Sequence, residues 1–172
     1  MVSFVPARDA LMGRLEAVFG PAWEELAPGV QQPRTYLGFP PNEPPFYVAV
    51  DEIVDLASTG GAATMGHARI DFTLRVWCFA RHSSLRVASD TLMAYVGAVF
   101  EAVLADQRLG FAVDNSFPSL ESAGTSVDGS KYHVAAAAIA VECHVFSQCP
   151  ADLMEVVAAA NASEVAHGNG GH

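Results

Sequence analysis

Basic residues are scarce in this chain of 172 residues, and lysine occurs once, at Lys131. Nine lysines and arginines stand against 19 aspartates and glutamates, which gives a net charge of −10. Proteins that bind nucleic acid tightly need clustered basic side chains to replace the counterions of the phosphates. The composition therefore argues against a dedicated nucleic-acid binder, although an acidic surface would let DNA pass without holding it.

Charged residues of either sign are also few, at 16%, whereas 51% of the residues are hydrophobic. Soluble domains usually carry about a quarter charged residues. We expect other subunits to cover part of the surface, unless alanine-rich runs such as residues 135–138 reflect only a coding bias. The length suits one domain with a single hydrophobic core.

Cysteines and long apolar runs are limited as well. Cys78, Cys143 and Cys149 are three in number, which does not describe a disulfide framework, so we expect reduced and packed thiols. Residues 1–6 lack the basic and apolar regions of a signal peptide, and the apolar run over 134–141 is too short to span a membrane. We expect a protein that is made and kept in a cytoplasm.

Catalytic and metal-binding signatures are missing. Gly60–Gly61 is not followed by the Gly-Lys-Ser/Thr of a phosphate-binding loop. Cys143 and His144 are neighbours on a predicted strand and should point to opposite faces, which makes a shared metal ion difficult. His82 precedes Ser83–Ser84 at a strand-to-helix junction, where capping is the simpler role. We expect no enzyme, no cofactor and no metal site.

The chain is organised around residues 67–106, where an alternating strand leads into a long amphipathic helix. Over residues 69–79, apolar and polar side chains alternate, which indicates a strand with one buried face. Ser83–Ser84 offers hydroxyls for the start of a helix. The strand face predicted to be buried comprises Ile70, Phe72, Leu74, Val76 and Cys78. The helical stripe comprises Leu85, Ala88, Leu92, Val96, Val99 and Val103, widened by Met93, Tyr95, Phe100 and Leu104. We expect this stripe to pack on the inward face of the preceding strand.

Shorter elements surround this centre. Residues 6–19 are predicted to form a helix that ends at Gly20–Pro21. Residues 21–45 hold seven prolines, so we expect an extended arm without a helix, packed on its own domain or on a neighbouring subunit. The other predicted elements are a strand over 46–56, a loop over 58–66, a strand over 111–113 and 119–125 broken near 117–118, a hairpin turn over 126–130, a strand over 131–146 and a helix over 152–160.

These elements predict an α+β fold. We expect a mainly antiparallel four-stranded sheet that carries the long central helix and flanking N- and C-terminal helices. A single domain would cover residues 1–160, including the proline-rich arm over 21–45. Residues 161–172 contain few apolar side chains and are predicted to form a flexible tail.

The order of elements over residues 5–148 resembles that of the tail terminator proteins of long-tailed bacteriophages. The segment 68–80, ARIDFTLRVWCFA, followed by Ser83-Ser84-Leu85, carries most of the resemblance. The resemblance implies a structural protein of the virion, located at the head-proximal end of the tail and assembled in the host cytoplasm. Such a subunit forms a hexameric ring that ends tail tube polymerisation and provides the docking surface for the head connector. The implied partners are copies of the chain, the tail tube protein and the head-tail connector protein, with DNA passing through without specific binding and no membrane involved.

The resemblance has no motif that places the interaction residues. We expect contacts with neighbours or the tube from the segments 58–66 and 115–130, and an intersubunit arm from 33–45. The residues predicted to take part are Pro40, Pro41, Pro44, Pro45, Gly60, Gly61, Thr64, Asn115, Asp128 and Gly129.

Two alternatives remain open from the sequence. One is another head-tail connector or tail tube subunit of a phage, and a tube subunit would polymerise into long tubes. The other is a small cytoplasmic enzyme or ligand-binding domain with a pocket under the helix, which would form a monomer or dimer.

Overall fold

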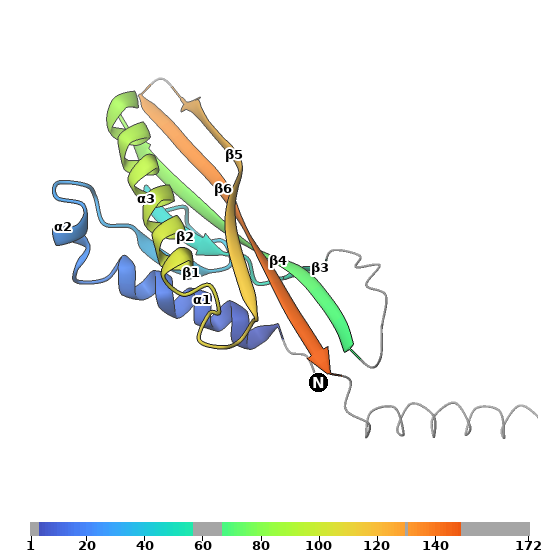
Figure 1. The fold of residues 1–172 in the computed structure, drawn as a ribbon. Helices are drawn as coiled ribbons and strands as arrows, with labels where there is room; N and C mark the ends of the chain where they lie inside the picture. The colour runs from blue at the N-terminus through green and yellow to red at the C-terminus, as the bar shows by residue number, and fades with distance from the viewer. Residues whose placement is uncertain (1–3, 57–66, 130, 149–172) are drawn as a thin grey trace, which may run out of the picture.

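The computed structural model of this chain places helices α1 and α3 on one face of a mixed β-sheet (Figure 1). It describes residues 4–56, 67–129 and 131–148. The helices described are α1 (Val5–Val18), α2 (Trp23–Leu26) and α3 (Leu85–Ala105). The strands described are β1 (Arg34–Leu37), β2 (Phe46–Val50), β3 (Asp55–Leu56), β4 (His67–His82), β5 (Asn115–Asp128) and β6 (Tyr132–Gln148). The predicted loop over 58–66, helix over 152–160 and tail over 161–172 lie outside the described residues.

The sheet has six strands in the order β1-β2-β4-β6-β5, with β3 also paired to β4. Strand β1 is parallel to β2, and the other pairs are antiparallel. The prediction of a mainly antiparallel four-stranded sheet is therefore wrong. Strand β1 lies in a proline-free stretch of the arm, and the predicted strand over 46–56 divides into β2 and β3, which pair with different parts of β4. Both differences arise from long-range pairing, which local alternation does not report.

The proline-rich arm packs on its own domain and contains α2, so the prediction that it has no helix is wrong. The Trp23 indole N–H donates to the carbonyl of Val30 at 3.0 Å. The Tyr95 hydroxyl on α3 donates to the carbonyl of Gln31 at 2.6 Å. These bonds tie the first half of the arm to the helical layer, because a buried indole or hydroxyl requires a partner.

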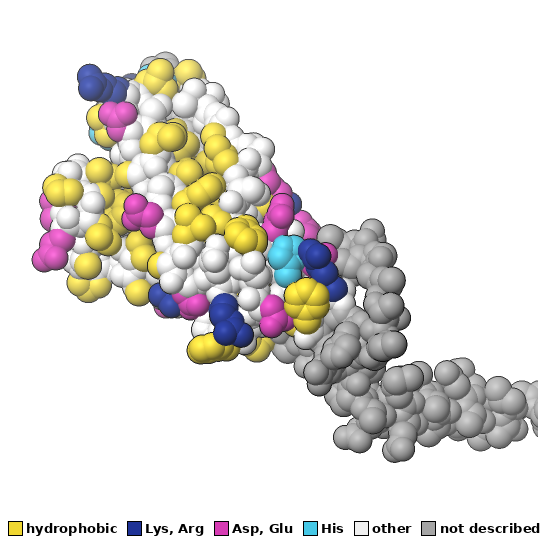
Figure 2. Space-filling view, in the orientation of Figure 1, with side chains coloured by type: hydrophobic (Ala, Val, Ile, Leu, Met, Phe, Trp, Pro, Cys, Tyr) yellow, Lys and Arg dark blue, Asp and Glu magenta, His cyan; other side chains and the backbone are white. Residues whose placement is uncertain are grey.

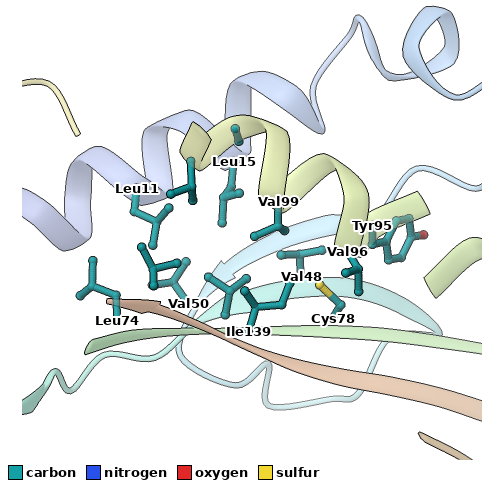
Figure 3. Close-up of a cluster of buried hydrophobic side chains, with 14 of the residues drawn as sticks. Leu11, Leu15, Val48, Val50, Leu74, Cys78, Tyr95, Val96, Val99 and Ile139 are labelled. Carbon is teal, nitrogen blue, oxygen red and sulfur yellow. The ribbon is translucent and has the colours of Figure 1, made fainter. Parts of the chain in front are cut away.

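The core lies between the sheet and the helices (Figure 3). Leu11 and Leu15 of α1 and Val99 of α3 are fully buried above Val48 of β2 and Ile139 of β6. The predicted inward face of β4 is confirmed for Phe72, Leu74, Val76 and Cys78. The helix begins at the predicted position, where the Ser84 hydroxyl accepts from the N–H of Val87. The predicted strand and helix therefore pack together as expected.

Part of the predicted helical stripe is wrong. The side chains of Leu85, Met93 and Leu104 are exposed, at 46%, 64% and 53%. Thr91 and Ala102 are buried in their place. Helix α3 has apolar residues on nearly every side, so three- and four-residue spacing could not select the side that faces the sheet.

Strand β5 is continuous through Phe117–Pro118, where a break was predicted. It forms an edge of the described sheet, and an edge strand tolerates a proline because the missing N–H need not face a partner strand. The irregularity lies instead between Leu120 and Ser122, where the register shifts. The predicted hairpin turn is confirmed by Gly129, whose φ of +65° suits a tight turn between β5 and β6.

Candidate interaction surface on helix α3 and strand β5

Helix α3 carries apolar residues on its exposed side as well as on its buried side. Its charged residues are Arg86, Asp90 and Glu101. By length and composition alone it would qualify as a membrane span, but it packs on the sheet and 44% of its most apolar window is buried. The packing on the sheet accounts for the apolar residues on the buried side of α3 but not for those on its exposed side. An exposed helix surface with so few charges is the kind of surface that another protein segment covers.

The exposed apolar residues of α3 follow a regular spacing. Met93, Gly97, Phe100 and Leu104 succeed one another at intervals of four, three and four residues, and we call these residues the α3 stripe. At about 100° per residue they share one flank of the helix, roughly opposite Tyr95. The Tyr95 ring faces the helical layer, with its centroid 5.8 Å from those of Phe19 and Trp23. The α3 stripe therefore lies on the flank turned away from α1.

Among the described residues, the space beside the α3 stripe at Gly97 is open. Apart from Gly97, its two chain neighbours and the backbone of its own helix within four residues, no heavy atom of these residues lies within 4 Å of the position that a Cβ on Gly97 would take. Phe100 is half-buried at the margin of the core, whereas Met93 and Leu104 are exposed. A small residue between larger apolar ones lets the backbone of a partner approach the helix closely.

Strand β5 continues this apolar surface. Leu120 is 49% exposed and stands opposite Ile139, so it faces the side of the sheet that carries α3. Val127, at 66% exposed, stands opposite His133 on the same side. Figure 2 shows hydrophobic side chains gathered over α3 and β5. We define the α3–β5 surface as the α3 stripe together with Leu120, Ala123 and Val127.

The outer edge of β5 is also open to a partner. Among the described residues no strand pairs with that edge, and residues 119–128 are all exposed. The charged side chains in this stretch are turned into ion pairs, Glu121 with Arg75 and Asp128 with Arg81. Edge strands are usually protected by free charges or prolines, and here Pro118 protects only the first part.

The opposite face of the sheet carries an ion-pair cluster around Arg75. Its guanidinium lies 2.7 Å from Glu121, 2.8 Å from Asp55 and 3.8 Å from Asp51. The hydrogen bond to Glu121 raises the pKa of Arg75 and lowers the pKa of Glu121. These carboxylates all lie around Arg75. Among the described residues, no group of three or more histidines, cysteines or acids is placed to hold a metal ion.

His82 and His144, which were considered above as candidate site residues, each contact another residue in the structure. The His82 Nδ1 atom accepts from the N–H of Ser84 at 3.0 Å, next to the start of α3, as the capping interpretation expects. His144 points away from the core, and its Nδ1 lies 2.6 Å from Asp71. Cys143 is buried on the other face of β6. Cys143 and His144 therefore lie on opposite faces, as predicted for strand neighbours.

The space beneath α3, where the enzyme alternative expects a pocket, is occupied by packed core side chains. The layer between helix and sheet is filled there by Val96, Val99, Val48, Cys78 and Ile139 (Figure 3). A surface hollow lies elsewhere, lined by Gly38, Phe39, Asp51, Glu52 and Ile53.

The predicted interaction residues fall in different places. In the arm, Pro40 is buried, Pro44 is half-buried, and Pro41 and Pro45 are exposed. Beside them, the Phe39 ring lies on Trp77 with centroids 5.5 Å apart. Asn115 and Asp128 are the two ends of β5, and Gly129 follows in the turn. Gly60, Gly61 and Thr64 lie outside the described residues.

Sequence reasoning did not single out the α3–β5 surface. It assigned Met93 and Leu104 to the core, and it included Leu120 only within the segment 115–130 that was expected to contact neighbours or the tube. The available signal was the small number of charged residues on the helix, since a surface helix normally carries more of them on its exposed side.

Comparisons with known proteins identify no family. No family model matches the chain, and no curated protein matches it. Among solved structures, the chain is similar to one in a structure described as the virion of a native gene transfer agent (GTA) particle. The sequence identity is 14%, the TM-score is 0.48, and the match covers 80% of this chain and 93% of that chain. A likeness at this level carries no argument about function, which has to be argued from the residues of this chain.

Proposed function

We propose that this chain is a structural subunit of a phage virion, a tail terminator that assembles with copies of itself into a ring. The observation that carries the proposal is the α3–β5 surface, which consists of apolar residues and glycine and is not covered by any other part of the described chain. Burying a leucine or methionine side chain contributes about 1.5–3 kcal/mol, so a few such residues favour association substantially. A surface that other subunits cover would also account for the low fraction of charged residues in the chain.

The position of this surface is compatible with a ring. The α3–β5 surface lies on one side of the subunit, and if it binds a different surface of the next copy, the head-to-tail contacts form a ring where the rotation between copies closes. The net charge of −10 suits a subunit around a channel through which DNA passes without specific binding. The other partners would be the tail tube protein on one side of the ring and the head-tail connector protein on the other. No bond is made or broken in this role.

The second candidate is another connector or a tail tube subunit, in which the same head-to-tail contacts repeat without closing. The open edge of β5 is the feature that favours it, because an unpaired edge can add strands along a filament.

The test is the assembly state of the purified full chain, measured by light scattering and negative-stain microscopy. We expect rings of about six subunits. Met93→Glu should give monomers with an unchanged circular dichroism spectrum, because the side chain is exposed. Leu26→Glu is the matched control, since Leu26 is 61% exposed on α2, outside the α3–β5 surface, and rings should persist. A discrete monomer or dimer of the wild-type chain would contradict the proposal, and long tubes would favour the second candidate.

A further inference from the structure

The C-terminal part of the sequence contains an apolar pattern that has no place in the described residues. Pro150 suits the first turn of a helix, and the apolar residues that follow are spaced as on one helical face. They are Leu153, Met154, Val156, Val157 and Ala160. A helix of this length is not stable by itself in water and needs an apolar surface to pack on.

The α3 stripe has the geometry that such a segment requires. Spacings of four, three and four residues are those of a helix that packs along a second helix. From Met93 to Leu104 the stripe extends about 17 Å, at about 1.5 Å per residue, and a helix from residue 153 to residue 160 would extend about 11 Å. The open space at Gly97 allows close approach.

We propose that residues 150–160 of one copy bind along the α3 stripe of the neighbouring copy. This inference rests on the proposed function and names the partner of the same surface. Each subunit then carries the segment at one end and its binding surface at another, which is the arrangement that head-to-tail assembly needs.

The described chain ends at a point that lies away from the α3 stripe of its own copy. The Ser116 hydroxyl donates to the carbonyl of Gln107, just past the end of α3, and Ser116 stands opposite Cys143 on β6. Strand β6 continues from that level to Gln148, beyond the C-terminal end of α3 (Figure 1). These five residues extend about 17 Å at about 3.4 Å per residue.

The link to residue 153 is too short to lay the whole segment along the α3 stripe of the same copy. From Gln148 to Leu153 the chain spans at most about 17 Å when fully extended. A chain that turned back along β6 would need this whole length to return to the level of the end of α3. A further distance of roughly 10 Å separates packed layers, so a return would bring at most the last residues of the segment to the Leu104 end of the α3 stripe of the same copy, and it could not lay the segment along that stripe.

Cross-linking between two different full-length chains tests the proposal. In a Cys149→Ser background, a chain with Met93→Cys is mixed with a chain with Val157→Cys, the mixture is assembled and then oxidised. We expect a disulfide-linked pair of the two chains. Val87→Cys is the matched control in place of Met93→Cys, because Val87 is exposed on α3 but lies off the stripe, and its pair should be absent.

Each other result overturns the inference in a recognisable way. Rings without the mixed pair would overturn it and leave the proposed function intact, whereas a chain that forms no ring would overturn both. Pairs formed by the Met93→Cys chain alone would mean that α3 meets α3 of the second copy. A link within a single chain that carries both cysteines would mean that the segment binds its own helix.

A second measurement uses substitutions in the segment itself. Val157→Glu places a charge on the apolar face, and we expect loss of the rings by light scattering. Ala159→Glu introduces the same charge about 130° away from the centre of that face, and rings should persist. Equal behaviour of the two variants would overturn the proposal.

Discussion

Arg75 and Glu121 form a two-point ion pair across the sheet: Arg75 Nε lies 2.7 Å from one carboxylate oxygen and Nη2 lies 3.1 Å from the other. The two residues belong to β4 and β5, which are separated by β6. The pair passes over β6 at Ala138 and Ala140, both buried although they lie on the face without helices. The register shift between Leu120 and Ser122 turns Glu121 toward Arg75. The alanine-rich sequence of β6 therefore has a structural reason here.

Glu121→Gln should lower the free energy of unfolding by about 0.5–1 kcal/mol at neutral pH, since the pair is partly exposed. The hydrogen bond to Arg75 holds the pKa of Glu121 below its ordinary value of 4.5. The stabilisation is therefore present above about pH 4.5 and lost as the pH falls through the folded pKa. Urea unfolding at a series of pH values should show a weaker acid dependence in the variant. Glu25→Gln, at an exposed position, is the control, and identical pH profiles for all three proteins would contradict this account.

Leu11→Ala should destabilise the protein by about 2–5 kcal/mol, because the side chain is fully buried between α1 and the sheet and its loss leaves a cavity. Leu26→Ala removes the same atoms from an exposed position on α2 and should change stability by about 0.5 kcal/mol or less. Urea unfolding of both variants measures the difference. Similar values would mean that α1 does not pack as described.

Tyr95→Phe removes the hydroxyl that donates to the carbonyl of Gln31 at 2.6 Å. We expect a loss of about 1 kcal/mol, because that carbonyl then has to find another donor. Hydrogen exchange should become faster around residues 23–32 in particular. Tyr36→Phe, at a half-exposed tyrosine, is the control, and an exchange pattern equal to the wild type in Tyr95→Phe would contradict the role of this bond.

The thiols of Cys78 and Cys143 should resist modification in the folded protein. Burial raises the pKa of each to about 12, so the reactive thiolate is rare near neutral pH. Peptide mapping after treatment with an alkylating reagent at pH 8 should find both residues modified only when denaturant is present. Rapid modification of either cysteine without denaturant would show that the core opens locally.

The α3–β5 surface was not predictable from local pattern, although its residues are in plain view in the sequence. Met93 and Leu104 have the same character as Val96 and Val103, and a helix with apolar residues all round offers no way to choose between them. Leu120 was expected in a strand, but its exposure depends on β5 being an edge of the described sheet, which follows from the pairing of β4 with β6.

The sequence by itself determined the inward face of β4, the start of α3 after Ser84 and the hairpin at Gly129, because alternation, capping and a φ of +65° act over a few residues. Only the tertiary structure decided that β1 joins the sheet in parallel, that the arm packs through Tyr95 and Gln31, and which side of α3 remains exposed. These features depend on contacts between residues far apart in the chain, whose free energies are set by packing and not by local preference.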